Sequence, residues 1–469
     1  MFKIYFTIIV LLAASANSYA GSKNSASVIV DPGRVYTFNE LTKMALKNRP
    51  VFNSTAAVKL KSDHLHKAVR SAYGPTVVAD AEFVVFNDKF NMPVVSDHPL
   101  NLPNIPSDIT DGITDALQTL IKPLPVRDQY IFHAGVTLAQ PLTRIYTIYH
   151  QDKALNDLSV KADIQKKVLE RTVKYNVSLA AIAVLEAKEM VKVSRQAVSS
   201  LESVATLAEN LVNAGTVGEY VALEAKASLS LGVAALKNAQ NVLAVAASAL
   251  ARTVGSDTLT ISNVKSLSDN LPPLPLSLNK SVEYGASHLP QLKIFTSVSA
   301  SSKHRIKVIK SNMFPQISLV GHYDFRKNIY LVPENEFSAG LNATWELLSW
   351  GRRHHLAQAA KSDAVIAEFN REEAVAIAKS RVYTAWLQYD AVPGQLDALK
   401  DAVKAARSTY NIYKVRFDAG DGVITSLILA HNRLMQTESL KVQTLYAGWR
   451  KYLTLKMNLG DGYDPVLDK

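Results

Sequence analysis

Residues 173–213, VKYNVSLAAIAVLEAKEMVKVSRQAVSSLESVATLAENLVN, decide the fold of this chain. Apolar residues recur every seven positions from Val173 and again from Val177, and only Ser194 breaks the two series. Neither proline nor glycine occurs anywhere between Arg144 and Asn213. Heptads sustained over this length predict a long helix that packs as a left-handed coiled coil.

A second stretch, residues 352–418, repeats this pattern with apolar residues at seven-residue intervals from Val382 to Phe417. A continuous helix over these 67 residues would be about 100 Å long at 1.5 Å per residue. Pro393-Gly394 is expected to kink or interrupt it, because proline removes an internal hydrogen bond. The chain therefore predicts two unusually long helices.

Short glycine-containing segments follow both long helices. Ala214-Gly215 and Ala419-Gly420-Asp421-Gly422 predict chain reversals, after which second helices return as far as Gly255 and Gly460. Glycine is the residue that most often terminates a helix in the left-handed conformation. Two helical hairpins are thus predicted, over residues 144–254 and 352–459.

Four segments alternate between apolar and polar residues, at about 76–86, 130–140, 316–326 and 336–347. Such alternation predicts amphipathic β-strands, and about ten residues is the length that a tilted strand needs to cross a bilayer. A soluble sandwich, or a sheet half covered by helices, would show the same alternation. The polar face of the first strand in each half includes Asp80, Glu82, His322 and Asp324.

The first 20 residues are typical of an export signal. Lys3 precedes the apolar stretch Ile4 to Ala14, and Ser18-Tyr19-Ala20 provides a small-x-small cleavage site before Gly21. An ordinary first helix or strand is the alternative. Because position 21 is glycine and not cysteine, a lipoprotein anchor is not expected there.

The two halves of the mature chain are predicted to be internal repeats. Thr37-Phe38-Asn39 and Asn48-Arg49-Pro50 recur 240 residues later as Ser277-Leu278-Asn279 and His288-Leu289-Pro290. Beyond the first strand the offset falls to 205, so the first half carries 35 extra residues. They lie in the proline-rich segment 87–127, which predicts a surface loop. The predicted divisions are a signal peptide 1–20, a first repeat 21–255, a linker 256–280, a second repeat 281–460 and a tail 461–469.

The composition excludes several classes of protein. The chain has 469 residues, no cysteine, 48% hydrophobic residues and a net charge of +11. Without cysteine there are no disulfides or thiolate metal sites, and after residue 20 no uncharged apolar run reaches the 18 residues of a membrane helix. Walker, His-Glu-x-x-His and Gly-x-Ser-x-Gly motifs are absent, so no enzyme, catalytic residue or cofactor is predicted. The side chains of His64 and His66 would point in different directions on a helix, so no metal site is predicted. The basic residues are dispersed along the chain and do not indicate nucleic-acid binding.

Four amphipathic strands cannot close a membrane barrel within one chain, because open sheet edges are not tolerated in lipid. Several chains must then contribute strands to one barrel. Exported helical hairpins about 100 Å long, attached to such strands, indicate a tube that crosses the periplasm below an outer-membrane barrel. The alternative is a periplasmic coiled-coil scaffold whose strands form a soluble sheet.

The duplicated opening, the prolines in Tyr73-Gly74-Pro75 and Met313-Phe314-Pro315, and the paired helices after the strands resemble the TolC family of outer-membrane efflux and secretion ducts. The resemblance covers nearly the whole mature chain. It implies an α+β membrane protein that forms a homotrimer, with a 12-stranded β-barrel continued by a long α-helical coiled-coil barrel. It also implies a passive conduit of drug efflux or type I secretion, partnered by a periplasmic adaptor and an inner-membrane pump or ABC exporter.

The resemblance also assigns places to residues. The four polar strand residues named above would line the barrel lumen, and the hairpin ends would form a periplasmic aperture that contacts the adaptor. The aperture candidates are Gly215, Glu219, Glu224, Arg416, Asp418, Gly420 and Asp421; solvated helix ends and caps are the alternative reading of the charges among them. Some family members carry an acidic ring at two positions that are Ser426 and Leu429 here, so an acidic constriction at those positions is not expected.

Overall fold

The computed structural model describes residues 34–92, 103, 105–122, 124–256 and 260–460. The predicted signal peptide and C-terminal tail therefore lie outside the described residues. Described residues within 57–164 and 293–374 form one compact unit, here called the sheet unit. Those within 1–56, 165–292 and 375–469 form a second unit, the hairpin unit. Each unit draws on both halves of the sequence.

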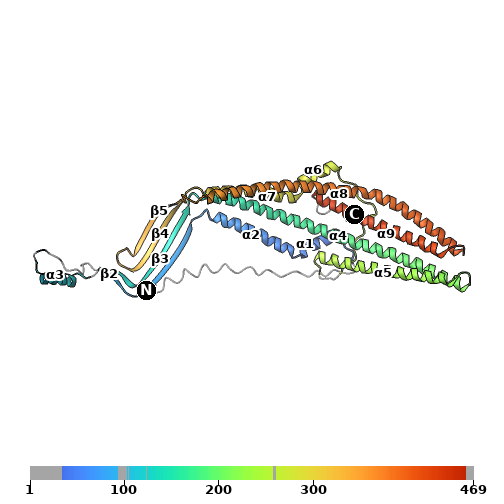
Figure 1. Ribbon diagram of the computed structural model, residues 1–469, viewed down its shortest axis with the longest axis horizontal. Coiled ribbons are helices and arrows are strands. Elements are labelled where there is room, and N and C mark those ends of the chain that lie inside the picture. Colours follow the sequence, from blue (N-terminus) through green and yellow to red (C-terminus); the bar gives the residue numbers. More distant parts are fainter. Residues whose placement is uncertain (1–33, 93–102, 104, 123, 257–259, 461–469) are drawn as a thin grey trace. The chain divides into compact units, whose positions relative to one another are not determined.

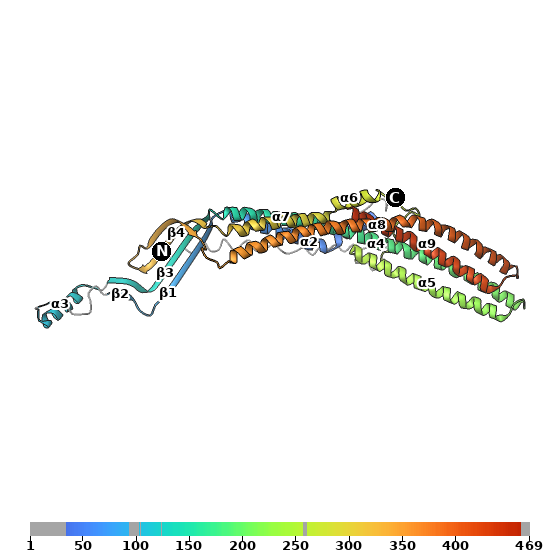
Figure 2. The same cartoon turned by 45° about the horizontal axis from the view of Figure 1, so that its top comes forward.

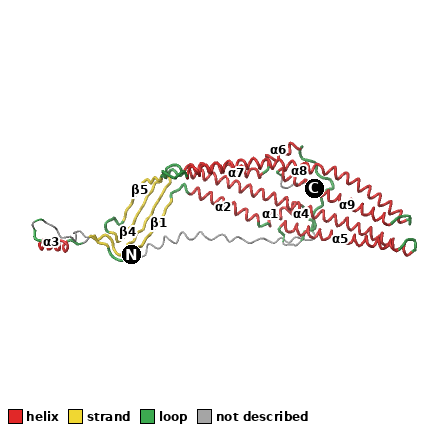
Figure 3. Tube along the Cα trace, in the orientation of Figure 1, coloured by secondary structure: helices red, strands yellow, loops and turns green. Residues whose placement is uncertain are grey.

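The sheet unit contains an antiparallel sheet in the order β1-β3-β4-β5 (Figure 1). Its strands are β1 (Thr76–Val85), β3 (Leu124–Pro141), β4 (Gln316–Ile329) and β5 (Asn335–Thr344), and the short β2 (Phe90–Met92) pairs with the start of β3. One long edge of β1 and one of β5 have no partner strand among the described residues. The described helices of this unit lie beyond the ends of the strands, and none of them covers a face of the sheet (Figure 3).

Proline and glycine set the boundaries where helices meet strands in this unit. α2 (Val51–Ser71) ends three residues before Gly74-Pro75, and α7 (Pro290–Ser311) ends before Phe314-Pro315. The residue before proline is disfavoured in the helical region, so the chain becomes extended and enters β1 and β4. Thr143 then ties the far end of β3 to β4, because the Ile317 amide donates to Thr143 Oγ1 at 2.8 Å.

The hairpin unit is built from helices packed along heptad seams. It contains α4 (Ile145–Asn213) from residue 165 onward and then α5 (Glu219–Val254). It also contains α8 (Arg352–Asp418) from residue 375 onward and then α9 (Ile424–Leu459). α5 and α9 lie side by side in this unit (Figure 2). Seam residues Val177, Val184, Val382 and Tyr389 are buried, as the heptads predict. α5 and α9 end at Gly255 and Gly460 in the left-handed conformation, which is also as predicted.

Two short helices complete the core of the hairpin unit. α1 (Phe38–Asn48) begins with a capping box in which the Glu40 amide donates to Thr37 Oγ1 and the Thr37 amide donates to Glu40. α6 (Leu278–His288) has Gly285 against Val382, where a Cβ would come within 2.6 Å of a valine methyl. The largest buried side chains of this core come from five helices and are Phe38, Leu41, Ile182, Leu250, Tyr389, Trp449 and Leu455.

Segment 87–127, predicted to be a surface loop, is not a loop throughout. It contains β2, the helix α3 (Ser107–Leu120) and the first residues of β3. Two of its described prolines lie near the starts of elements, where a missing amide costs least: Pro106 precedes α3, and Pro125 is near the start of β3, opposite Asn91 of β2. The second predicted strand consequently begins at Leu124 and not near residue 130.

A kink or an interruption was predicted at Pro393-Gly394, and the interruption is not found, because α8 is helical from Arg352 to Asp418. Pro393 is exposed, while Val392 and Leu396 beside it are buried in the seam. Packing on both sides of the proline therefore holds the helix together across the lost hydrogen bond.

Among the described residues, no helix is both long enough and apolar enough to cross a bilayer.

Candidate functional site

The register of the sheet places the four predicted lumen residues on one face. Asp80 lies opposite Gly135, and Gly135 lies opposite Asp324 in the next strand. A Cβ at position 135 would come within 3.1 Å of Asp80 Oδ1 and 3.4 Å of Asp324 Oδ1. Glycine between the two aspartates therefore leaves the room that their carboxylates occupy. Glu82 and His322 lie in adjoining rows of this face, and Glu82 is exposed.

Asp324 is the centre of a charged cluster on this polar face. Its carboxylate contacts His133 Nε2 at 2.6 Å, His322 Nε2 at 2.9 Å and an Arg326 guanidinium nitrogen at 2.7 Å. Arg326 also pairs with Glu336 at 2.5 Å, and His322 Nδ1 lies 2.8 Å from Thr137 Oγ1. Packing within the cluster leaves Asp324 only 5% exposed, although this face of the sheet is largely accessible to solvent. Groups of three or more side chains arranged to hold a metal ion are not found among the described residues.

Sequence reasoning missed two members of this cluster. His133 lies in the polar phase of its predicted strand, so the alternation contained the signal, although nothing pointed to its partner. Arg326 lies at the predicted end of its strand, whereas β4 continues to Ile329. The cross-strand partners depend on residues about 190 positions apart, which no local pattern identifies.

Replacing Asp324 with alanine should lower the thermal stability of the protein, because His133, His322 and Arg326 would lose their shared carboxylate. The loss should exceed that of Glu82→Gln, which alters an exposed side chain on the same face. The measurement is the temperature at which each purified variant loses its native migration in mild detergent. Equal temperatures for the two variants would contradict a structural role for the cluster.

The opposite face of the sheet is apolar, and no described helix covers it. One row across it joins Ala79, Val136, Tyr323 and Phe337. Phe83 is 65% exposed and Phe337 is 75% exposed, so large apolar side chains face outward on both edge strands. Contiguous exposed apolar surface of this kind marks a face that contacts another protein or lipid.

The ends of the helical hairpins hold the predicted aperture residues. In the second hairpin Gly420 has a φ of +80°, and Arg416 pairs with Asp421 at 3.3 Å. A Cβ at Gly422 would lie 2.6 Å from the Phe417 backbone, so this turn is tight enough to require glycine. Below it, Phe417 packs into a buried cluster with Ile424 and other residues of the hairpin ends.

In the first hairpin, Gly215 has a φ of +71° and Thr216 donates to the Leu211 carbonyl at 2.7 Å. Glu219 is the exposed first residue of α5, where a negative charge favours the helix dipole, and Glu224 is half-buried. Among the seven predicted aperture residues, all of which are described, the structure joins only Arg416 and Asp421 in an ion pair.

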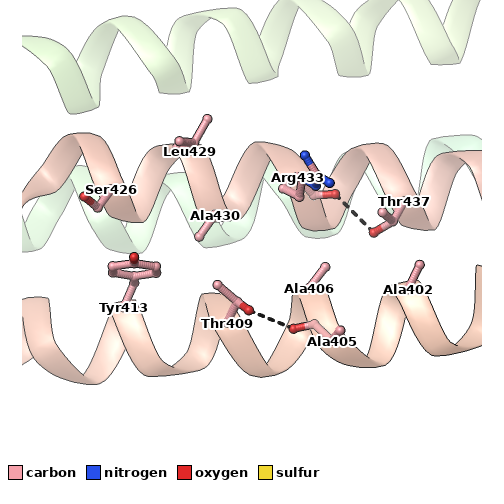
Figure 4. Close-up of a pocket in the computed structure, with 10 residues that line it drawn as sticks. All are labelled: Ala402, Ala405, Ala406, Thr409, Tyr413, Ser426, Leu429, Ala430, Arg433 and Thr437. Carbon is pink, nitrogen blue, oxygen red and sulfur yellow. Dashed lines mark hydrogen bonds between the residues drawn. The ribbon is translucent and has the colours of Figure 1, made fainter.

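A groove of about 520 Å³ runs between α8 and α9 behind this end of the hairpin (Figure 4). Its walls are mostly small side chains, and the hydroxyls of Thr409 and Thr437 donate to carbonyls of their own helices. Ser426 and Leu429, at the family's acidic positions, both line it, and Leu429 is 70% exposed. The groove therefore has a small-residue lining without an acidic pair at these positions.

His431 lies buried in the same helix pair. It is 2% exposed, both ring nitrogens lack a hydrogen-bond partner, and its ring centroid is 5.5 Å from that of Tyr410. Burial lowers the pKa of His431, so the imidazole is neutral at pH 7. Sequence reasoning did not single it out, since one histidine in a heptad helix gives no signal of burial.

The comparisons with known proteins agree with this geometry. Residues 284–461 match the family model of the outer membrane efflux proteins. A comparison with curated protein sequences gave no significant match.

Several solved channels share the fold. The outer-membrane channel OprN matches with a TM-score of 0.74 and 18% identity, covering 95% of this chain and 98% of its own. The CmeC outer membrane channel of Campylobacter jejuni matches with a TM-score of 0.74 and 15% identity, covering 91% and 86%. CusC, whose structures concern folding and transmembrane channel formation, matches with a TM-score of 0.75 and 13% identity, covering 90% and 92%. The predicted resemblance to the TolC family is thus confirmed: the chain carries an outer membrane efflux protein domain over residues 284–461 and has the fold of TolC-like channels over most of its length.

Proposed function

We propose that this protein is the outer-membrane exit duct of a tripartite efflux or type I secretion system. The observation that carries the proposal is the four-stranded amphipathic sheet, which has one apolar uncovered face, one charged face and two unpaired edges among the described residues. The efflux-family domain and the channel fold of most of the chain support it. In this assignment the apolar face contacts lipid, and the Asp324 cluster lines the lumen.

The proposed assembly is a homotrimer in the outer membrane. Lipid offers no hydrogen bonds to the free edges of β1 and β5, so each edge must pair with another chain. Pairing β5 of one chain with β1 of the next keeps all neighbours antiparallel, and three chains of four strands close a barrel of 12. The hairpin units would extend into the periplasm as a coiled-coil barrel, and the signal at residues 1–20 would direct export.

The hairpin ends are proposed to form the periplasmic aperture. The tight turn at Gly422 and the Arg416–Asp421 pair hold the end of the second hairpin in a compact form. A periplasmic adaptor would contact these ends and the aperture would open when the inner-membrane pump or ABC exporter is recruited. Transport energy would come from that pump, so the duct itself performs no catalysis.

The proposed trimer can be tested by disulfide cross-linking, because the natural chain has no cysteine. Ala81→Cys on β1 would be combined in turn with Phe337→Cys, Ala339→Cys, Leu341→Cys and Ala343→Cys, all on the apolar phase of β5. Each double variant would be oxidised in outer-membrane fractions. We expect at least one pair to give a covalent ladder that ends at three chains.

The control for this experiment is Ala81→Cys alone, which has no cysteine on the opposite edge and should give no ladder. Release of the protein into the soluble periplasm, or a ladder that ends at another number, would overturn the proposed assembly. The cargo is a separate question. Deleting the gene and measuring both antibiotic susceptibility and the secreted proteome would distinguish drug efflux from protein secretion.

A further inference from the structure

The helix α3 (Ser107–Leu120) has three different faces. Ile109, Ile113, Ala116 and Leu120 follow one another at spacings of four, three and four residues, which is a coiled-coil seam. Thr110 and Thr114 lie about 100° further round the helix. The helix belongs to the part of the chain with no counterpart in the second half of the sequence.

Among the described residues of α3, buried side chains lie on the threonine face. Thr110 and Thr114 are 5% and 6% exposed, and their hydroxyls donate to backbone carbonyls at 2.8 and 2.7 Å. The seam is left open, because Ile109 is 54% exposed and Leu120 is 79% exposed. Because the threonines of α3 are buried while its isoleucines are exposed, the apolar side of the helix has no partner among the described residues.

The charges of this segment indicate which partner fits. Asp108, Asp111 and Asp115 lie on the side of α3 away from the seam, and residues 90–121 contain neither lysine nor arginine. An acidic helix without basic residues is repelled by an anionic lipid surface, whereas membrane-surface helices carry lysine and arginine. Other copies of the same helix can meet along the seam while their aspartates face water. Isoleucine at seam positions favours three or four helices over two.

Connectivity places α3 at the correct end of the sheet for such contacts. β1 starts next to α2 and runs away from it, so the β1–β3 connection, which contains α3, lies at the far end of the sheet. Only residues 121–123 separate α3 from β3. A barrel of 12 strands has a radius on the order of 12 Å, while 14 helical residues extend about 21 Å. Each α3 can therefore reach the barrel axis from its own wall.

We propose that the three α3 helices of one trimer pack against each other through the seam Ile109, Ile113 and Leu120, and form a three-helix plug over the outer mouth of the barrel. The partners of this surface are the same seams of the other two copies of the chain. The proposal rests on the trimer proposed above. A plug of this kind would restrict the passage of large solutes from outside while the periplasmic end is open.

The test again uses the cysteine-free chain. Ile113→Cys places one thiol in the seam, and Asp111→Cys, on the opposite side of the same helix, is the matched control. Both variants would be oxidised in intact cells. We expect Ile113→Cys to give a disulfide-linked pair of chains at least five-fold more abundant than Asp111→Cys gives, with the third thiol of each trimer left free.

A second readout does not depend on cross-linking. The double substitution Ile109→Ser and Ile113→Ser should raise single-channel conductance in planar bilayers and sensitivity to vancomycin, while Asp108→Asn with Asp111→Asn should change neither. If β1–β5 cysteine pairs still give a covalent trimer but Ile113→Cys gives no more pairing than Asp111→Cys, the plug is refuted and the duct stands. If both cross-links fail, the trimer itself is wrong.

Discussion

Replacing Gly422 with alanine is expected to force open the turn between α8 and α9. The new Cβ would lie 2.6 Å from both the nitrogen and the Cα of Phe417 and 2.9 Å from its Cβ. These are backbone-anchored atoms, so no side-chain rotation relieves the overlap, and overpacking of this kind costs about 1–3 kcal/mol. Because Phe417 is 2% exposed in the cluster at the hairpin end, the strain should spread into that cluster.

The functional consequence follows from the proposed aperture. If the hairpin end holds the duct closed, Gly422→Ala should raise single-channel conductance and admit trypsin to Arg416, which the intact turn pairs with Asp421. Gly394→Ala is the matched control, because residue 394 lies within α8 and an added Cβ would meet no atom within 4 Å. That control should be neutral or stabilising by about 0.5–1 kcal/mol. Unchanged conductance and digestion in Gly422→Ala would show that this turn is not part of the closed state.

The coiled-coil part of the fold was predictable because its signal is local and periodic. Val177 and Val382 each begin a buried series that the heptads identify without knowledge of any partner. Pro393 misled the same reasoning, since its effect depends on packing by Val392 and Leu396 and not on the proline alone. Local patterns therefore predict where the long helices lie, but they do not predict whether a proline interrupts one of them.

The sheet was predictable only strand by strand. Alternation identified the polar phase that holds Asp80 and Asp324, but their approach across Gly135 follows from a register set by three separated strands. The helix α3 was missed for a different reason. Its 14 residues follow a run of prolines and include one glycine and three threonines, so composition indicated a loop.

The linker between the two halves was recognised in the sequence, but its packing was not. Three aromatic side chains from α8 and α9 donate hydrogen bonds to its backbone. Trp449 donates to the Ser268 carbonyl at 3.2 Å and Trp386 to the Leu276 carbonyl at 3.0 Å, while Tyr389 donates to the Pro272 carbonyl. We call these three residues the linker clamp. They hold the connection between the halves against the core of the hairpin unit.

Trp449→Ala should be the most destabilising single change in the clamp. Trp449 is 1% exposed. The linker side chain of Leu271 packs closely against the neighbouring Gly448, because a Cβ added at position 448 would lie 2.6 Å from a Leu271 methyl. Removing the indole leaves a cavity in this close packing and an unpaired linker carbonyl, for a cost of about 3–5 kcal/mol. Trp449→Phe keeps most of the volume and loses the hydrogen bond, at about 1 kcal/mol.

The readout that isolates the clamp is tryptic cleavage after Lys265 and Lys280, which lie on either side of the clamped segment. We expect rapid cleavage in Trp449→Ala, slow cleavage in Trp449→Phe and unchanged cleavage in Trp350→Ala, because Trp350 is 89% exposed and belongs to the sheet unit. A general loss of stability would accelerate cleavage throughout the chain, whereas loss of the clamp should accelerate it first at these two lysines. If Trp449→Ala and Trp350→Ala are cut at the same rate there, the aromatic side chain does not hold the linker, and the two halves of the chain must be joined by other contacts.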